Sequence, residues 1–313
     1  VTCFADMYEP SDVLIDMVTE AKIRANISGP RIGQENDLDN TNYINHIKKY
    51  NDSNDGLLKE YTIIHSVYTY SEEKIKNRIA VAKEAGTGIQ IHISEATFET
   101  DLMNEKYGKT TVEVLNEWGL FDVPTLAAHC VHLSDNDIKI LKEKSVNVAH
   151  CPSSNLKLAS GIANIPRLLK EGINVCIGTD GVSSNSNLNM IEEMHITSLI
   201  HKGHFMDPLV LNAKEVIQMA TINGARALGF GDLAGSLEVG KKADLIIIDT
   251  DKAHLTPLTD VLSAIVYSMQ ASDVDTVMVN GTILMEGRKL LHMDEEKIKR
   301  EVNARAKKIL TEK

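Results

Sequence analysis

The sequence predicts a (β/α)8 barrel of the TIM type, followed by a small β-sheet near the C-terminal end of the chain. Up to Gly181, short apolar runs rich in Val, Ile and Thr alternate with longer amphipathic stretches, which is typical of repeated βα units. The runs are almost wholly apolar, as expected of parallel strands that are covered on both faces. Beyond Gly181 the pattern changes to helices and then to turn-rich strands, which predicts a second, smaller sheet.

Seven strands are predicted in the barrel. They cover residues 1–7, 23–27, 61–67, 88–94, 125–131, 146–151 and 175–179. A closed barrel of this type needs eight strands. Because the chain opens within an apolar run, the first strand of the barrel is expected before Val1.

Helices are predicted between these strands, among them 72–84, 110–118, 135–144 and 165–171. The third follows Ser134, and Asp137 stands three residues later, a spacing that resembles a capping box.

The part of the chain after Gly181 begins with two predicted helices, 188–200 and 213–228. Strands at 243–249, 276–279 and 282–286 follow, and Asn280-Gly281 between the last two is a strong hairpin signal. A charged amphipathic helix is predicted at 294–313. We therefore divide the chain into a barrel (1–235), a small β-sheet (236–290) and a C-terminal helix (291–313).

The composition is that of a globular enzyme, with 43% hydrophobic and 25% charged residues in 313. A formal net charge of −11 argues against a nucleic-acid partner. No apolar run approaches the roughly 18 residues that a membrane crossing requires, and no leader opens the chain, so no membrane association is expected. The four cysteines lie in apolar runs without a CxxC pair, which favours reduced thiols and a cytoplasmic location.

Polar residues follow three of the predicted strands, in the runs 91–95 (IHISE), 128–132 (AHCVH) and 178–181 (GTDG). The C-terminal ends of barrel strands meet at one face, where this architecture has its active sites. His92, His129 and Asp180 are therefore predicted to converge on one divalent metal, for which Zn²⁺ suits the donors best.

Each of these residues also has a structural interpretation. A single histidine at a strand end is more often a hydrogen-bonded structural residue, and Asp180 suits a turn. Their joint occurrence on separate strands favours the metal site. His150, which ends the strand at 146–151, is a fourth candidate, but the following Pro152 and Ser153 favour a supporting or turn role.

These residue types predict a hydrolytic displacement at an sp² carbon. A metal lowers the pKa of a bound water to about 7. Asp180 can coordinate the metal and accept the proton of that water. Glu95, three residues past His92, can deliver the proton to a ring nitrogen of the substrate, and His129 can stabilise the developing charge.

Several runs resemble the amidohydrolase superfamily and, within it, the methylthioadenosine/S-adenosylhomocysteine deaminases. They are TLAAHCVHL at 125–133, HCPSSNLKLA at 150–159, GTDGVSSN at 178–185, ATINGARALG at 220–229 and GSLEVGKKADL at 235–245. The resemblance covers essentially the whole chain. Guanine deaminases and s-triazine hydrolases share most of these runs, so the substrate is less closely defined than the superfamily.

The resemblance implies that the barrel (1–235) is a metal-dependent catalytic domain and that the small sheet (236–290) is part of a composite β-sandwich. It also implies roles for individual residues. His92 and Asp180 match metal ligands, and Glu95 matches the acid that transfers a proton. His129 matches the residue beside the activated water, and His65 matches a histidine that touches the purine edge.

Two features depart from the family pattern. The family's first barrel strand carries a His-x-His pair that supplies two further metal ligands; the pair does not occur in this sequence and is expected before Val1. In the loop after Ile27, where relatives carry arginines for the substrate carboxylate, Arg31 is the candidate.

The expected function is therefore metal-dependent deamination of an adenosine-like nucleoside by water, acting on 5′-methylthioadenosine, S-adenosylhomocysteine or both. A guanine deaminase or an s-triazine-type chlorohydrolase is the alternative among enzymes. A truncated barrel that holds no metal is the alternative of another class. A homo-oligomer is compatible with the sequence.

Overall fold

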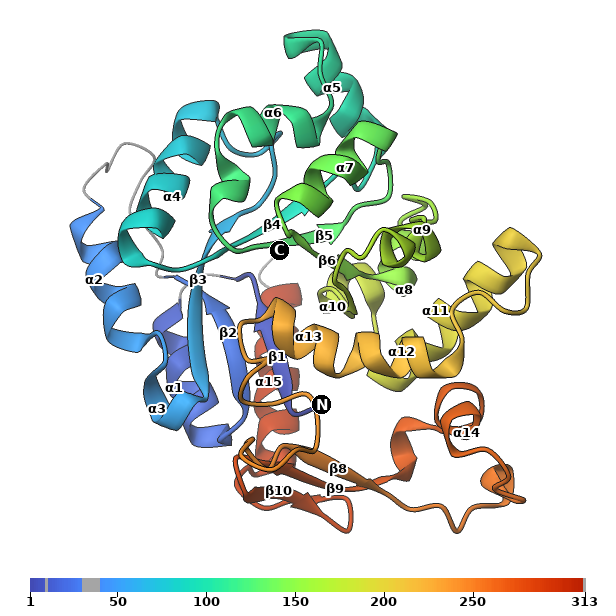
Figure 1. Ribbon diagram of the computed structural model, residues 1–313. Helices are drawn as coiled ribbons and strands as arrows, with labels where there is room; N and C mark the ends of the chain where they lie inside the picture. The colour runs from blue at the N-terminus through green and yellow to red at the C-terminus, as the bar shows by residue number, and fades with distance from the viewer. Residues whose placement is uncertain (9–10, 30–39, 312–313) are drawn as a thin grey trace.

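A computed structural model of the chain describes residues 1–8, 11–29 and 40–311. Within these residues, seven strands form one curled parallel sheet in which each strand pairs with the next along the chain (Figure 1). The predicted α/β barrel architecture and its seven strands are confirmed. Their bounds are β1 (Cys3–Asp6), β2 (Arg24–Ser28), β3 (Leu58–Ile64), β4 (Ile89–Ile93), β5 (Thr125–His129), β6 (Asn147–His150) and β7 (Val175–Ile177).

Strand β3 lies three residues earlier than the sequence predicts. Leu58 pairs with Ala25 of β2, so the strand begins where the neighbouring strand offers partners. After Ile64 the backbone turns, with the Tyr70 N–H donating to the Ser66 carbonyl. The predicted end at Val67 was therefore wrong, because those residues form a turn above the sheet.

Helices cover the outer side of the sheet (Figure 1). The capping box of Ser134 and Asp137 is present at the start of the helix they precede. The predicted helix 213–228 is two helices, because Thr221 (φ −127°, ψ −98°) interrupts it. In the barrel part the helices are α1 (Ser11–Ala21), α2 (Thr41–Tyr50), α3 (Ser53–Gly56), α4 (Glu72–Ala85), α5 (Thr97–Tyr107), α6 (Thr111–Glu117), α7 (Asp135–Glu143), α8 (Pro152–Lys157), α9 (Ile165–Lys170), α10 (Val182–Asn185), α11 (Met190–Phe205), α12 (Ala213–Ala220) and α13 (Ile222–Ala227), with a 3-10 turn at Leu120–Asp122.

The main core lies between the sheet and these helices. In β4, the three isoleucines Ile89, Ile91 and Ile93 are fully buried in this layer. Because side chains alternate along a strand, Gln90 and His92 point to the inner side of the curled sheet. This alternation places the His92 side chain in the interior of the barrel.

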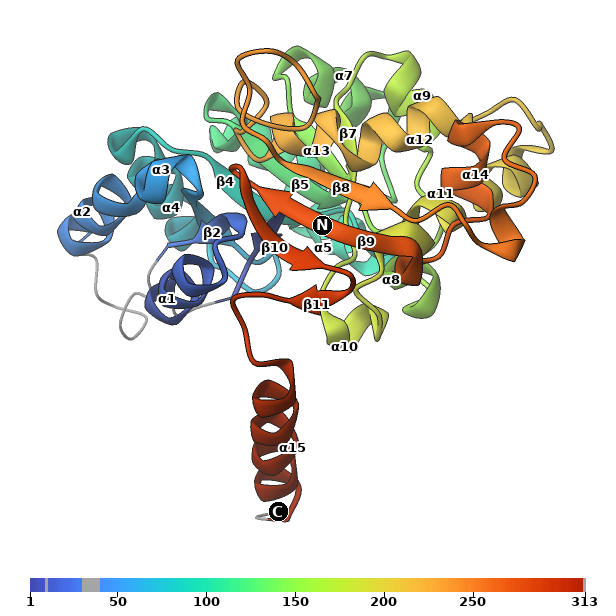
Figure 2. The same ribbon diagram turned by 90° about the horizontal axis from the view of Figure 1, so that it is seen from below.

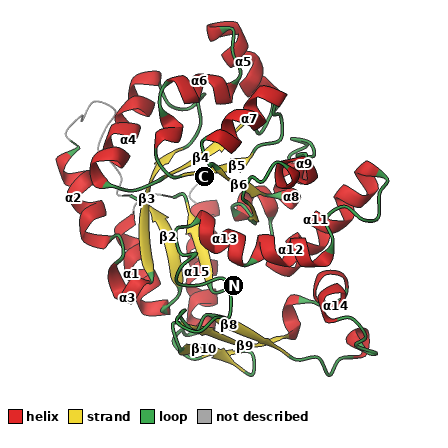
Figure 3. Cartoon of the chain, viewed as in Figure 1, coloured by secondary structure: helices red, strands yellow, loops and turns green. Residues whose placement is uncertain are grey.

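The second sheet is antiparallel and lies below the barrel, in the order β11-β10-β9-β8 (Figures 2 and 3). Its strands are β8 (Leu245–Ile248), β9 (Val274–Val279), β10 (Thr282–Glu286) and β11 (Lys289–Leu290). Asn280 and Gly281 both have positive φ (50° and 77°), as a type I′ hairpin turn requires, so the predicted hairpin is confirmed.

Two helices accompany the second sheet, with 3-10 turns at Ala253–Leu255 and Ala271–Asp273. Helix α14 (Val261–Tyr267) packs on α11 and α12, and its Val266 joins the main core. The predicted C-terminal helix is α15 (Glu295–Thr311), which projects away from the body, with none of its described residues buried (Figure 2). Within the described part of the chain, none of the helices has the length and apolar character needed to cross a membrane.

Candidate active site

The carboxyl ends of three barrel strands carry residues in left-handed backbone conformations. The φ angles are 50° at Ser94 after β4, 72° at His129 in β5 and 61° at Asp180 after β7. Such angles are uncommon for residues other than glycine and cluster at functional sites. At His129 the positive φ breaks the alternation of the strand, which brings this side chain next to His92 on the inner side.

His92 is held by the neighbouring strand. Its Nδ1–H donates to the backbone carbonyl of His65 over 2.7 Å, which leaves the lone pair of Nε2 available. The two imidazole rings lie 4.8 Å apart. Burial, and second the neighbouring His129, lower the pKa of His92 to about 4, so the ring is neutral at neutral pH.

His129 and Glu95 face one another across the site. The His129 ring stacks on His92 at 5.5 Å, and its Nε2 lies 3.7 Å from Oε2 of Glu95. Its Nδ1–H donates to Oδ1 of Asn155 over 2.8 Å, which fixes the orientation of the ring. The other carboxylate oxygen of Glu95 accepts a hydrogen bond from the Ser160 hydroxyl at 3.4 Å.

Asp180 is held by the same short helix that orients His129. Ser154 Oγ donates to Asp180 Oδ2 over 2.6 Å, and Asn155, the next residue of α8, accepts from His129. The negative charge of Asp180 acts to raise the pKa of His92, which places the two groups within electrostatic reach. Helix α8 starts with Pro152 directly after β6, so its first turn lies at the rim of the sheet.

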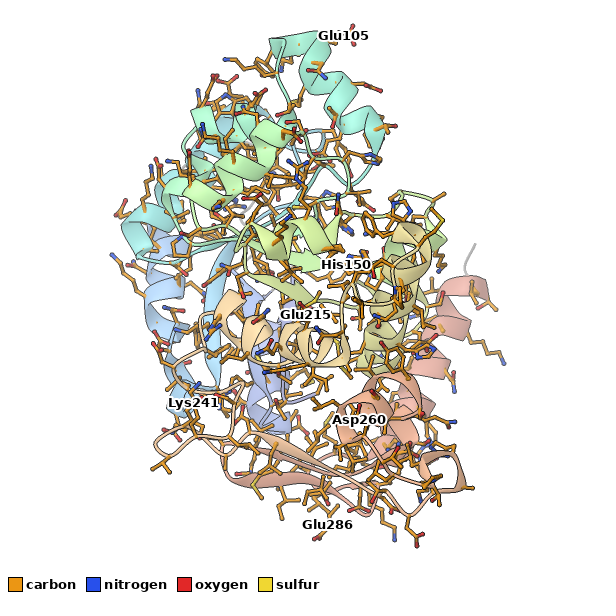
Figure 4. All side chains as sticks on the ribbon, turned by 45° about the vertical axis from the view of Figure 1, so that its right-hand side comes forward. Glu105, His150, Glu215, Lys241, Asp260 and Glu286 are labelled. Carbon is orange, nitrogen blue, oxygen red and sulfur yellow. The ribbon has the colours of Figure 1, made fainter. Side chains whose placement is uncertain are left out.

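His150 lies outside this cluster. His150, labelled in Figure 4, is buried. Its ring lies 5.2 Å from that of His201 in α11. Burial lowers the pKa of His150 well below its ordinary value. The structure thus places this fourth candidate in the helix-facing layer, because it shares the outward direction of Val148 in β6.

Of the residues that the sequence singled out, the structure brings together His65, His92, Glu95 and His129, with Asp180 beside them. Arg31 lies outside the described residues. Sequence reasoning missed Ser154, Asn155 and Ser160. The signal for the first two was a proline-initiated helix directly after a barrel strand, which turns its first polar residues toward the strand ends.

A surface hollow of about 500 Å³ between α7 and α9 offers no comparable chemistry. Its charged residues pair with one another, Arg167 with Asp135 and Lys142 with Glu171. We therefore place the candidate site at the strand ends.

The donors at the strand ends fit part of a zinc site. His92 offers a neutral imidazole nitrogen, and Asp180 offers a carboxylate. Catalytic zinc is usually held by at least three protein ligands. Within residues 1–8, 11–29 and 40–311, no group of three or more His, Cys, Asp or Glu is arranged to hold a metal.

Known proteins resemble this chain over nearly its whole length. A 5-methylthioadenosine/S-adenosylhomocysteine deaminase of Acetivibrio thermocellus is 50% identical over 311 residues, which cover 99% of this chain and 72% of that protein. A 5′-deoxyadenosine deaminase of Methanosarcina acetivorans is 42% identical, with 99% and 72% covered.

Solved structures agree with this likeness. The crystal structure of an adenosine deaminase from Xanthomonas campestris with bound zinc matches with a TM-score of 0.94 and 30% identity, and the match covers 99% of this chain and 72% of that one. The family model described as the amidohydrolase family matches residues 1–284. The superfamily that the sequence motifs indicated is therefore confirmed, and the chain belongs to the amidohydrolase family, as a hydrolytic aminohydrolase.

Proposed function

We propose that this chain carries the catalytic residues of a hydrolytic deaminase of adenosine-like nucleosides, acting on 5′-methylthioadenosine, S-adenosylhomocysteine or both. The observation that carries the proposal is the convergence of the His92 and His129 rings with the Glu95 carboxylate at one rim of the sheet, beside Asp180. The names of the relatives support the substrate class.

The reaction exchanges the amino group on C6 of the adenine ring for an oxygen from water. Asp180 takes a proton from the attacking water, because its carboxylate is held beside the site by Ser154. Glu95 donates a proton to a nitrogen of the ring, so that electrons from the broken ring double bond are accepted there. Asp180 then gives its proton to the amino group, which leaves as ammonia, while the hydroxyl proton on C6 returns to Glu95 and the inosine-type carbonyl forms.

Two histidines position and stabilise the reacting groups in this proposal. His129, oriented by Asn155, stabilises the charge that develops on the attacking oxygen. His65 is exposed beside His92 and is the residue that contacts the purine edge. We also propose Arg31 as a contact for the carboxylate of an S-adenosylhomocysteine substrate.

A divalent cation, Zn²⁺ by preference, is the cofactor that this chemistry requires. His92 and Asp180 are the residues of this chain that would hold it. When bound, such an ion acts as a Lewis acid toward water. A cytoplasmic location, a homo-oligomeric state and the division at residues 235 and 290 remain our proposals.

Because His92 and Asp180 are two donors and catalytic zinc usually has at least three protein ligands, the test uses the full-length protein with added Zn²⁺. It is assayed on a panel of 5′-methylthioadenosine, S-adenosylhomocysteine, 5′-deoxyadenosine, adenosine and guanine. Deamination is followed by the absorbance change of the purine and by ammonia release. We expect turnover of at least one of the first two compounds. Turnover of guanine alone, or of no compound, would overturn the proposal.

A further inference from the structure

A buried carboxylate lies directly behind the proposed acid. Glu99, in the first turn of α5, is 1% exposed. Its Oε1 accepts the backbone N–H of Ser94 over 2.8 Å, and its Oε2 accepts the backbone N–H of Glu95 over 3.4 Å. The side chain thus binds the two peptide groups that flank the α-carbon of Ser94 and lead into Glu95.

The turn that Glu99 binds is fixed from the other side as well. The Ser94 carbonyl accepts the N–H groups of Val131 and His132, both at 3.0 Å, in the loop after β5. The carbonyls at the end of β4 are therefore bonded to the β5 loop, and the N–H groups are bonded to Glu99. In the described structure the Glu99 carboxylate thus accepts the N–H groups that follow β4, as backbone carbonyls of a neighbouring strand do within a sheet.

Ser94 needs such support because its φ of 50° is left-handed. For a residue with a Cβ atom this conformation costs roughly 1–2 kcal/mol. It persists where the surroundings determine it. Here it sets the direction in which the next side chain, Glu95, leaves the backbone.

We infer that Glu99 is a positioning residue that fixes the turn Ser94–Glu95 and so holds the Glu95 carboxylate at His129. This inference rests on the proposed function for its kinetic consequence, but not for its structural one. Burial raises the pKa of Glu99 to about 7, so the fold holds this carboxylate at a site that disfavours its charge. Keeping an acid there is consistent with a role in the reaction rather than in stability.

Glu113 offers a matched control. It is also a glutamate in the first turn of a helix, α6, and it accepts the backbone N–H of Thr110 over 2.9 Å. In the described structure its own carboxylate is bonded to Thr110 and Asn136, which are not residues of the candidate site. Glu99→Gln and Glu113→Gln therefore replace a carboxyl group by an amide at the same helix position.

The experiment compares kcat, KM and amide hydrogen exchange in the zinc-supplemented enzyme and both variants. An amide at position 99 keeps one acceptor and turns an N–H group toward the other peptide. We expect Glu99→Gln to lower kcat on the order of 10²-fold, as a displacement of about 1 Å at a reacting group does, with KM changed less than about threefold. The Ser94 and Glu95 amides should exchange faster, and Glu113→Gln should change neither reading.

Three results would overturn the inference. They are unchanged kcat in Glu99→Gln, an equal loss in Glu113→Gln, and unchanged exchange at the Ser94 and Glu95 amides. Should Glu99→Gln fail to fold, Glu99→Asp serves, since it keeps the charge but withdraws it by one methylene, and the same losses are expected. If the unchanged enzyme shows no deamination, the proposed function fails, while the exchange experiment still decides the role of Glu99.

Discussion

Buried polar groups have different partners at the amino ends and at the carboxyl ends of the seven barrel strands. At the amino end, Arg24 forms a bidentate ion pair with Asp244 of the second sheet, at 2.7 and 2.9 Å, and both side chains are essentially unexposed. The guanidinium also donates to the Gly56 carbonyl, and Asp244 accepts the N–H of Asn280. Each of these two buried charges thus has a partner of opposite sign.

At the carboxyl end the buried carboxylate of Glu99 is bound by peptide N–H groups. The strand ends there contain left-handed residues, and imidazole nitrogens face a shared space. A buried carboxylate that disfavours its own charge and unfavourable backbone angles reduce stability, so their concentration at one end of the strands indicates function. The amino ends of the barrel strands thus join the two sheets, whereas the carboxyl ends hold the reactive groups.

The largest effect that we expect is at Asp180. In Asp180→Asn the amide keeps the shape and the hydrogen bond from Ser154, so the fold should be retained. Loss of the proton acceptor and of a metal donor together should reduce kcat/KM by at least about 10⁴-fold. The exposed Asp135→Asn is the control and should keep full activity. Comparable activity in both variants would place the chemistry elsewhere.

A second, smaller loss is expected at Glu95. Glu95→Gln leaves His92 and Asp180 in place, so zinc content should equal that of the unchanged protein. The rate should fall on the order of 10² to 10⁴-fold for a lost acid–base group. Glu105 at the tip of α5 is exposed and far from the rim (Figure 4), so Glu105→Gln should leave the rate unchanged. Full activity of Glu95→Gln on every substrate would exclude the proposed mechanism.

The strand alternation and the motifs were sufficient to predict which residues reach the rim. His92 follows from its position in an apolar strand, and seven strands were located with only β3 misplaced. The convergence of His129 on the site was predicted from its place at a strand end and from the motif, but not from alternation, because its inward direction depends on a positive φ that no residue type at position 129 signals. A strict alternation from Ala127 would have pointed His129 toward the helices.

Supporting contacts were also beyond the sequence. Glu99 and Ser160 approach Glu95 from a helix and a loop whose packing is set by the whole barrel. The pairing of Arg24 with Asp244 joins residues 220 positions apart, and neither lies in a pattern that predicts a partner. Long-range polar contacts are selected by tertiary geometry, whereas periodicity reports on local structure alone.

The third prediction concerns the amino end. Arg24→Met should lower the free energy of unfolding by about 3–5 kcal/mol, because it leaves Asp244 buried without a cation. Activity per folded molecule should be retained. The double variant with Asp244→Leu should recover most of the loss, since an apolar pair replaces the ion pair. Denaturant unfolding measures the free energy of unfolding, and a parallel assay measures activity. A loss of kcat without a loss of stability would contradict the division of roles between the two ends of the strands.

The last prediction concerns Glu99, a buried carboxylate that forms no ion pair with a cation among the described residues, and has the smallest magnitude. Its pKa is about 7 in the folded chain against an ordinary 4.5, and burial is the main cause. Between these pH values the unfolded state has released the proton while the folded state retains it. The unfolded state thus binds fewer protons, and the free energy of unfolding falls as pH rises through this window. Nearby Glu95, Tyr68 and Cys130 also interact with this charge.

Glu99→Gln removes this dependence. The free energy of unfolding of the variant should exceed that of the unchanged protein by an amount that grows by roughly 1–3 kcal/mol from pH 5 to pH 8, since each pKa unit corresponds to about 1.4 kcal/mol. The sign is opposite to that at Arg24, where removing a charge destabilises the fold. Denaturant unfolding of both proteins at pH 5, 6, 7 and 8 provides the measurement, with Glu113→Gln as the reference for a partly exposed capping glutamate. If the difference in free energy of unfolding between the two proteins stays constant across this range, the charge of Glu99 is compensated in the fold. The contrast between the two ends of the strands would then rest on geometry alone.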